Sequence, residues 1–228
     1  MNTDMKKLKI GMLLFPDLTL LDFIGPYDVF VRAACFEVFV VSEHEVPIKG
    51  EGGLLLQPDY SFDNCPPVDI VFVPGGRGVT ALLTNETYKR FLVEQAKTAQ
   101  YITAVCTGSL LLAACGLLVG YKATTHWRSL ELLKLLGVEV VEERVVTDRN
   151  RITGGGITAG IDFGLVLTAI VGGEEMAKTI QLLLEYTPEP PFDSGHPKTA
   201  DPHILKLGVE LTQPQFDKRL KLLQKIIL

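Results

Sequence analysis

Continuous apolar runs alternate along this chain with segments in which apolar residues recur every three or four positions. The continuous runs predict strands at residues 9–15, 36–41, 69–73, 101–105, 138–141, 145–147 and 152–153. The helical spacing predicts a helix that begins at Pro26 and further helices at 86–99, 109–115, 127–136, 158–171 and 174–185. Runs without polar alternation are typical of parallel strands that are buried on both faces. We therefore expect an α/β fold, a single-domain flavodoxin-like sandwich whose mostly parallel sheet has helices on both faces.

Two departures from this alternation are visible. Short extended segments at 46–48 and 54–57 flank the glycine-rich turn 50–53 and predict a hairpin. After Tyr186 the chain becomes proline-rich and then enters a charged helix at 202–228. This last part is too short for an independent domain. We therefore expect an α/β domain at residues 8–186 and an extension at 187–228 that packs on this domain or on a dimer partner.

The composition is that of an ordinary globular protein, with 228 residues, 47% hydrophobic residues and a formal net charge of −5. This charge and the lack of a basic patch argue against nucleic acid as a partner. Residues 1–7 are polar and lack the pattern of a secretory signal, so we expect a cytoplasmic protein with no membrane partner.

The four cysteines, Cys35, Cys65, Cys106 and Cys115, lie singly in the sequence. None belongs to a C-x-x-C pair or has a histidine pair nearby, so the pattern indicates neither a zinc site nor a disulfide framework. We expect reduced thiols and no bound metal.

Cys106 is the strongest candidate for chemistry, because it ends a strand-like run and a glycine-containing turn then opens into a helix. A sharp turn of this kind, a nucleophile elbow, presents its central side chain to N–H groups and to the helix dipole. We expect a depressed thiol pKa and partial thiolate character at neutral pH. The plainer interpretation is a small buried hydrophobic residue, and the position in the turn favours the nucleophile.

Gly75 and Gly76 follow the strand at 69–73, where the sequence lacks the spacing of a P-loop or a dinucleotide-binding fold. Nucleotide binding is therefore not indicated. Glycines let the backbone approach a ligand closely, and their N–H groups, with those of Thr107 and Gly108, are candidates for an oxyanion hole. A tight turn after the strand explains each glycine equally well.

Asp22 stands alone among large apolar residues. It is either a cap or turn residue for the helix at Pro26, or a partly buried acid with a raised pKa that shares a proton with a thiolate. His126 is either the base of a Cys-His pair or a structural cap. The neighbouring Trp127, together with Ile157, is expected to shape a substrate pocket.

Five motifs together carry a family resemblance: Leu-Asp-x-x-Gly-Pro, Pro-Gly-Gly, Val-Cys-Thr-Gly, Ala-Thr-Thr-His-Trp and Gly-Gly-Gly-Ile-Thr-Ala-Gly-Ile-Asp-Phe. Over residues 9–186 the chain resembles the PfpI/ThiJ superfamily of class I glutamine amidotransferase-like proteins. Within that superfamily it looks most like the isonitrile hydratases, a likeness that includes the segment 185–192.

The resemblance implies a hydro-lyase that converts a small isocyanide to an N-substituted formamide through a thioimidate on Cys106, without metal or organic cofactor. It implies that Asp22 is the acidic partner and that Thr107, Gly75 and Gly76 surround the reacting atoms. It also implies a homodimer. The superfamily's proteases and glyoxalases have histidine beside the cysteine, or glutamate in place of Asp22, so the resemblance argues against those activities.

Two other functions stay open. One is a regulator-like domain that lacks its helix-turn-helix. Transcription regulators of the superfamily carry the same Val-Cys-Thr-Gly and Ala-Thr-Thr-His-Trp motifs and continue into a helix-turn-helix domain, for which we expect the roughly forty residues after Tyr186 to be too few. A non-enzymatic redox sensor or chaperone built on the same thiol is the other alternative, because exposed cysteines of low pKa oxidise readily.

Overall fold

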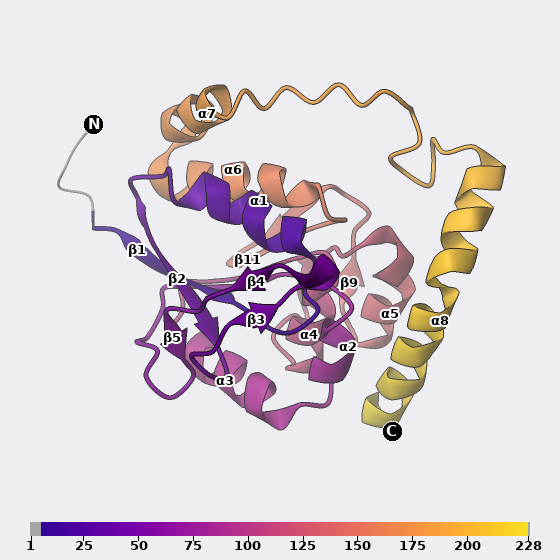
Figure 1. The fold of residues 1–228 in the computed structure, drawn as a ribbon, viewed down its shortest axis with the longest axis horizontal. Coiled ribbons are helices and arrows are strands. Elements are labelled where there is room, and N and C mark those ends of the chain that lie inside the picture. Colours follow the sequence, from indigo (N-terminus) through magenta and orange to yellow (C-terminus); the bar gives the residue numbers. More distant parts are fainter. Residues whose placement is uncertain (1–5, 228) are drawn as a thin grey trace.

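The computed structural model describes residues 6–227 of the chain. Figure 1 shows a central sheet between two layers of helices, with a long C-terminal helix at one end of the molecule. The expected α/β sandwich is therefore confirmed.

The central sheet, within the described residues, has seven strands in the order β10-β11-β7-β6-β1-β2-β5. Neighbouring strands pair in parallel except β10 and β11, which are antiparallel. The strands are β1 (Leu8–Leu13), β2 (Phe36–Ser42), β5 (Tyr60–Ser61), β6 (Ile70–Val73), β7 (Tyr101–Val105), β10 (Val145–Asp148) and β11 (Arg151–Gly154).

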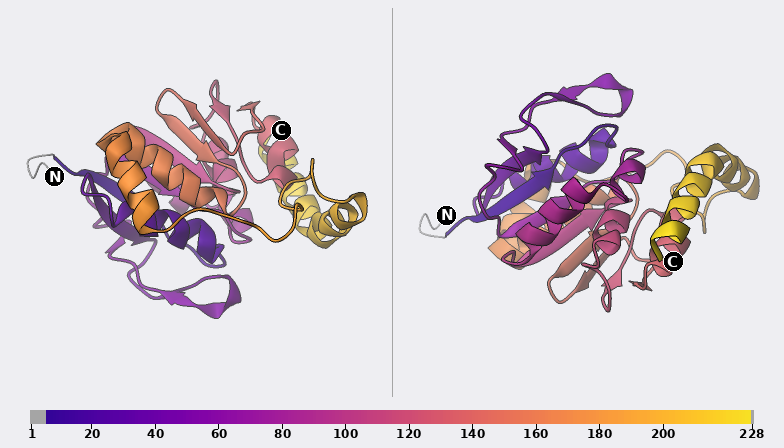
Figure 2. Two further views of the ribbon diagram at one scale, coloured as in Figure 1. Left: turned by 90° about the horizontal axis from the view of Figure 1, so that it is seen from above. Right: turned by 90° about the horizontal axis from the view of Figure 1, so that it is seen from below.

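The helices divide between the two faces of this sheet (Figure 2). One face carries α1 (Leu20–Phe30), α6 (Ala159–Gly172) and α7 (Glu174–Leu183), and α1 packs along α6. The other carries α2 (Val79–Leu82), α3 (Glu86–Ala96) and α4 (Gly108–Ala114), with α5 (Leu130–Leu135) beside α4. Each strand of the sheet centre is thus covered on both sides, which explains its continuous apolar sequence.

Two smaller pairs of strands lie outside the main sheet. The predicted hairpin is confirmed as β3 (Ile48–Lys49) and β4 (Leu55–Leu56), which pair antiparallel around a 3-10 turn at Glu51–Gly53. Strands β8 (Lys122–Ala123) and β9 (Glu139–Val140) pair in parallel.

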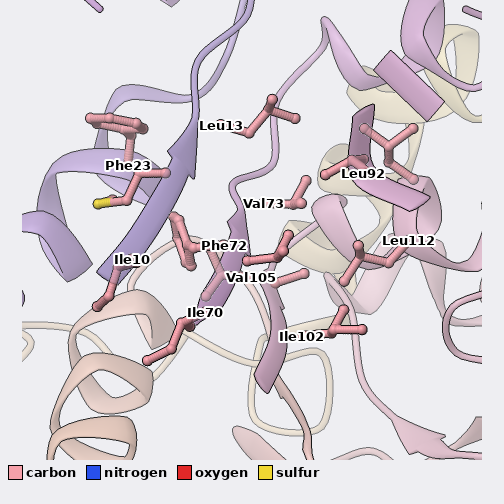
Figure 3. Packing of buried hydrophobic residues seen from close by; sticks show 14 of the residues in the cluster. Ile10, Leu13, Phe23, Ile70, Phe72, Val73, Leu92, Ile102, Val105 and Leu112 are labelled. Carbon is pink, nitrogen blue, oxygen red and sulfur yellow. The ribbon is translucent and has the colours of Figure 1, made fainter. Parts of the chain in front are cut away.

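The core is built from large apolar side chains with almost no exposed surface. Phe30 of α1 packs edge-on against Phe72 of β6 and Phe163 of α6, at centroid distances of 6.1 and 6.2 Å. Figure 3 shows side chains from neighbouring strands gathered with Leu92 and Leu112 of the helices on the other face. A fully buried side chain of this size contributes roughly 1.5–3 kcal/mol to folding, so the site above the sheet rests on a rigid base.

The first helix begins at Leu20, so the predicted start at Pro26 is wrong. Phe23, Pro26 and Phe30 are all buried, and this spacing of three and four residues continues one face of the helix through the proline. Pro26 lies inside the helix, and the packing of that face against α6 outweighs the hydrogen bond that proline cannot donate.

The C-terminal part leaves the body after α7, crosses the molecule as an irregular segment, and ends in α8 (Pro202–Ile227) beside α5 (Figure 1). Between residues 6 and 227 there is no helix that is both long and apolar enough to cross a membrane.

Candidate active site

Cys106 occupies the turn between β7 and α4 with a φ of +52°, a left-handed conformation that non-glycine residues seldom adopt. Hydrogen bonds hold it there. Its N–H donates to the carbonyl oxygens of Gly154 (3.0 Å) and Gly155 (2.8 Å). Its own carbonyl oxygen accepts a bond of 2.7 Å from the Thr125 hydroxyl. The sequence therefore produces the predicted elbow, at the carboxyl ends of the parallel strands.

Gly108 allows this elbow to form. It begins α4 directly against the end of β6, and a Cβ on Gly108 would collide with the carbonyl oxygens of Val73 and Pro74. Gly108, a predicted substrate-binding residue, is buried and is not among the residues that line the cavity above Cys106. Its function is close packing of helix on strand.

Asp22 lies beside Cys106, with Gly75 between them. A Cβ added to Gly75 would come within 2.7 Å of Asp22 Oδ2 and 2.7 Å of Cys106 Cβ. Asp22 is the third residue of α1 and is completely buried, and within residues 6–227 neither of its carboxyl oxygens accepts a well-formed hydrogen bond. The alternative of a cap for a helix at Pro26 is therefore excluded.

The two groups change each other's protonation. Burial raises the pKa of Asp22 from 3.8 to about 7, and the neighbouring Cys106 offsets part of that rise. Burial also raises the pKa of the Cys106 thiol well above 9.0, and the charge of Asp22 adds to the rise. The expected depressed thiol pKa is therefore wrong. The Thr107 N–H does lower the thiol pKa, but burial outweighs it. The pair as a unit retains a proton at neutral pH.

The loop after β6 is tied to the elbow through Thr107. The Gly76 N–H donates a 3.1 Å hydrogen bond to Thr107 Oγ1. The same hydroxyl donates a 3.3 Å hydrogen bond to the Gly76 carbonyl oxygen. The Gly76 N–H, a predicted donor of an oxyanion hole, is therefore already bonded to Thr107 in this structure. The Gly75 N–H interacts with Asp22 and lowers the pKa of that carboxyl.

His126 acts as a structural cap. Its Nδ1 accepts a 3.2 Å hydrogen bond from the Arg128 N–H at the start of the 3-10 turn Trp127–Ser129. Burial lowers the pKa of His126 to about 4, and the charges of Arg219 and Arg128 lower it further. The ring is therefore neutral, with its proton on Nε2. This nitrogen can donate a hydrogen bond, but it cannot accept a proton from Cys106.

A cavity of about 350 Å³ opens above Cys106. Of the predicted residues, it is lined by Gly76, Cys106, Thr107, His126 and Ile157. Asp22 and Gly75 lie behind Cys106 and do not line it. Trp127, which we expected to shape the substrate pocket, lines a separate, smaller hollow against the segment 194–208.

One wall of the cavity comes from the C-terminal helix α8, in which the sequence analysis predicts no site residue. Helix α8 contributes Leu211, Thr212, Pro214, Gln215, Phe216 and Arg219. A sequence signal for this docking exists: Phe216, Leu220 and Leu223 recur at helical spacing and form a buried face, and Arg219 lies next to it. Among residues 6–227 no cluster of three His, Cys, Asp or Glu side chains could hold a metal ion.

Known proteins are similar to this chain in sequence and in fold. The profile of the DJ-1/PfpI family matches residues 8–170. The isonitrile hydratase of Pseudomonas putida is 47% identical over 217 residues, which cover 90% of this chain and 95% of that protein. The HTH-type transcriptional regulator GbdR of Pseudomonas aeruginosa is 39% identical over 136 residues, which cover 59% of this chain but 37% of the regulator.

A solved structure extends the likeness to the C-terminal part. The crystal structure of a THiJ/PfpI family protein from Pseudomonas syringae superposes with a TM-score of 0.93 at 39% identity and covers 96% of this chain and 91% of that one. The family profile covers most of the α/β body and includes both Asp22 and Cys106. The chain therefore belongs to the DJ-1/PfpI family.

Proposed function

We propose that this protein is an isonitrile hydratase, a hydro-lyase that adds water to a small isocyanide and releases an N-substituted formamide. The observation that carries the proposal is Cys106 in the lining of a cavity, with the buried acid Asp22 directly behind it. The 47% identity to the Pseudomonas putida isonitrile hydratase, over nearly the whole of both chains, supports it.

The first step adds Cys106 to the isocyanide. The sulfur forms a bond to the terminal isocyanide carbon, and the proton that the Cys106 and Asp22 pair retains is delivered to the same carbon. The product is a thioimidate, in which that carbon is bonded to sulfur and hydrogen and doubly bonded to nitrogen. Asp22 suits this transfer because its pKa of about 7 lets it hold or release a proton at neutral pH.

The second step releases the product. Water adds to the thioimidate carbon, one of its protons goes to nitrogen, and the carbon–sulfur bond breaks as the sulfur regains a proton. The formamide leaves and the thiol is restored. Thr107 holds the loop around the sulfur, while Ile157 and the His126 Nε2–H face the cavity and are proposed to orient the substrate. No step of this cycle needs a cofactor.

A turnover assay with a simple alkyl or aryl isocyanide tests the proposal. We expect the formamide to appear with the wild-type protein and to disappear with Cys106→Ser. Cys65→Ser is the matched control, because the half-buried Cys65 thiol donates to the Pro66 carbonyl oxygen and is not among the residues that line the cavity. Absence of formamide with the wild-type protein, or normal turnover with Cys106→Ser, would contradict the proposal.

The same assay separates the enzyme from a redox sensor or chaperone. A sensor would show oxidation of Cys106 by peroxide, seen as a mass increase, without turnover of an isocyanide.

Two copies of the chain are proposed to pair through α1. Leu21 and Ile24 of this helix and Val31 just after it expose 42%, 36% and 47% of their surface, and such apolar residues are stabilised by burial in a two-fold interface. We expect a dimer in sedimentation equilibrium at micromolar concentration. A monomer under those conditions would contradict the pairing.

The chain is proposed to consist of one α/β domain at 8–186 and the extension at 187–228, which completes the site of its own domain. This is supported by the contacts of Arg219 and Gln215 with the loop after β6. We also propose a cytoplasmic location, because the chemistry needs a reduced Cys106. Cell fractionation with an antibody tests the location.

A further inference from the structure

The cavity above Cys106 is cationic in an otherwise acidic protein. Arg77, Arg128 and Arg219 line it, and Glu51 is the one carboxylate in the lining within the described residues. His126 is neutral. The chain as a whole has a net charge of −5. A positive cavity in a negative protein favours a ligand with negative charge.

Arg219 is the most buried of these cations, with 7% of its surface exposed. Its Nε donates to Thr80 Oγ1 at 3.0 Å and its Nη2 to the Gly76 carbonyl oxygen at 2.7 Å. Both acceptors are neutral. Within residues 6–227 its Nη1 has no hydrogen-bond partner and no carboxylate forms a salt bridge with it, yet Nη1 is not among the atoms sealed from solvent. Arg219 lines the cavity, so this nitrogen is a donor that a ligand there can use.

Arg128 is fixed in a similar way. Its guanidinium stacks on the Phe216 ring at 4.1 Å, its Nε donates to Thr212 Oγ1 at 3.2 Å, and its Nη2 donates to Gln213. These partners are neutral as well, and Nη1 has no partner among the described residues. The charges of Arg128 and Arg219 both lower the pKa of His126, so the two guanidinium groups lie near one imidazole.

Glu51 acts on Arg219 through its charge but, within residues 6–227, forms a salt bridge with neither Arg219 nor Arg128. Its carboxylate accepts from the Arg77 N–H at 3.0 Å and from the Thr19 hydroxyl at 3.1 Å, and its nearest guanidinium is that of Arg77, at 3.9 Å. Arg219 and Arg128, which within the described residues share no salt bridge with a carboxylate, therefore line the cavity above the nucleophile together with the neutral His126. Buried cations are stable when an anion pairs with them, and a carboxylate matches the guanidinium geometry.

We propose that this cavity takes isocyanides that carry a carboxylate, with the isocyanide carbon at Cys106 and the carboxylate on Arg219 and Arg128. This rests on the proposed hydratase activity. An isocyano carboxylic acid is ionised at neutral pH and supplies the missing counter-charge without another residue. Helix α8, which carries Arg219 and the Phe216 platform under Arg128, is then the element that selects the substrate.

The test compares isocyanoacetate with its uncharged methyl ester, which differ at the carboxylate alone. We expect the wild-type kcat/KM to be about ten- to a hundredfold higher for the acid, the range of a charge-assisted hydrogen bond. Arg219→Met and Arg128→Met should each reduce this preference about tenfold or more, mainly through a higher KM for the acid. The exposed Lys218 of α8 provides the control, because Lys218→Met removes the same charge without touching the cavity and should leave the preference unchanged.

Equal kcat/KM for acid and ester in the wild-type protein would overturn the proposal. So would an equal loss for both substrates in both arginine variants, which is the result expected if these residues only support the fold or the thiol. If no isocyanide is turned over at all, the hydratase activity fails, and calorimetric titration with N-formylglycine and its methyl ester still tests the anion site. Preferential binding of the acid that Arg219→Met removes supports the site, and equal or absent binding overturns it.

Discussion

Arg219 Nη2 donates a 2.7 Å hydrogen bond to the carbonyl oxygen of Gly76, 143 residues earlier in the chain. This bond fastens α8 to the loop after β6, which is itself held to the nucleophile elbow by Thr107 Oγ1. The C-terminal extension is thus a wall of the cavity. A motion of α8, or a substitution that breaks this contact, should therefore change the activity at Cys106.

The docking of α8 can be tested at Leu223, which is completely buried. Leu223→Ala should lower the free energy of unfolding by about 2–5 kcal/mol, because it leaves a cavity between α8 and the body. Denaturant unfolding should remain a single transition. Lys221→Ala, at an exposed position of the same helix, should change stability by less than about 0.5 kcal/mol. An early separate transition in the wild-type protein would show that α8 unfolds independently.

Gly75 can be tested because it separates the two reacting side chains. In Gly75→Ala the new Cβ would lie 2.7 Å from Asp22 Oδ2, Cys106 Cβ and the Thr107 nitrogen, so these groups must move apart. We expect isocyanide turnover to fall on the order of 10²-fold, the effect of a displacement near 1 Å at reacting atoms.

Gly208→Ala is the matched control for that substitution. A Cβ on Gly208 meets no atom within 4 Å, and the residue lies inside α8. Alanine there should stabilise the helix by about 0.5–1 kcal/mol and leave turnover unchanged. Equal activity of the two variants would show that close packing at Gly75 is not required.

His126 should make stability depend on pH. Its pKa is 6.5 in the unfolded chain and about 4 in the folded one, so between these values the unfolded chain binds more protons. The free energy of unfolding should therefore rise with pH across this window, by up to about 3 kcal/mol for this group. His126→Asn keeps a capping acceptor and should remove this part of the slope. Urea titrations of both proteins at several pH values measure the difference, and identical slopes would contradict the buried neutral imidazole.

Much of the sheet could be predicted from sequence, because its central strands are buried on both faces and their apolar runs are continuous. Elements such as β5 and α2, with two and four residues, are too short to show a period. Proline favours the first turn of a helix, which predicts a start at Pro26, but the apolar spacing from Phe23 to Phe30 continues the helix through this residue.

The part of the site that depends on local backbone geometry, the turn at Cys106, could be predicted from the sequence. The turn at Cys106 has a local signature, and its positive φ follows. The protonation of Cys106 and the wall that carries Arg219 depend instead on how distant segments pack, and no local pattern reports burial of a thiol. Interpreting Cys106 as an exposed, low-pKa thiol failed for this reason.

The proton held by Asp22 gives the sharpest test of the mechanism. Its pKa is 3.8 in the unfolded chain and about 7 in the folded one, so between these values the folded chain binds more protons. The contribution of Asp22 to stability is therefore lost as pH rises through this window. Asp22→Asn cannot ionise, so its stability relative to the wild-type protein should increase from pH 4 to pH 7 by a few kcal/mol.

The same variant should be a poor catalyst. Asp22→Asn keeps the shape of the side chain but has no proton to transfer, so turnover of an isocyanide should fall on the order of 10²-fold or more at neutral pH. Asp22→Glu keeps the acid but adds a methylene in a space that Gly75 leaves just wide enough, and its activity should fall through displacement of Cys106. A more stable yet nearly inactive Asp22→Asn protein is the combined signature of a buried catalytic acid. Near-normal turnover of the Asp22→Asn variant would show that Asp22 is not the proton donor. A stability difference between the two proteins that does not change with pH would contradict the raised pKa of Asp22.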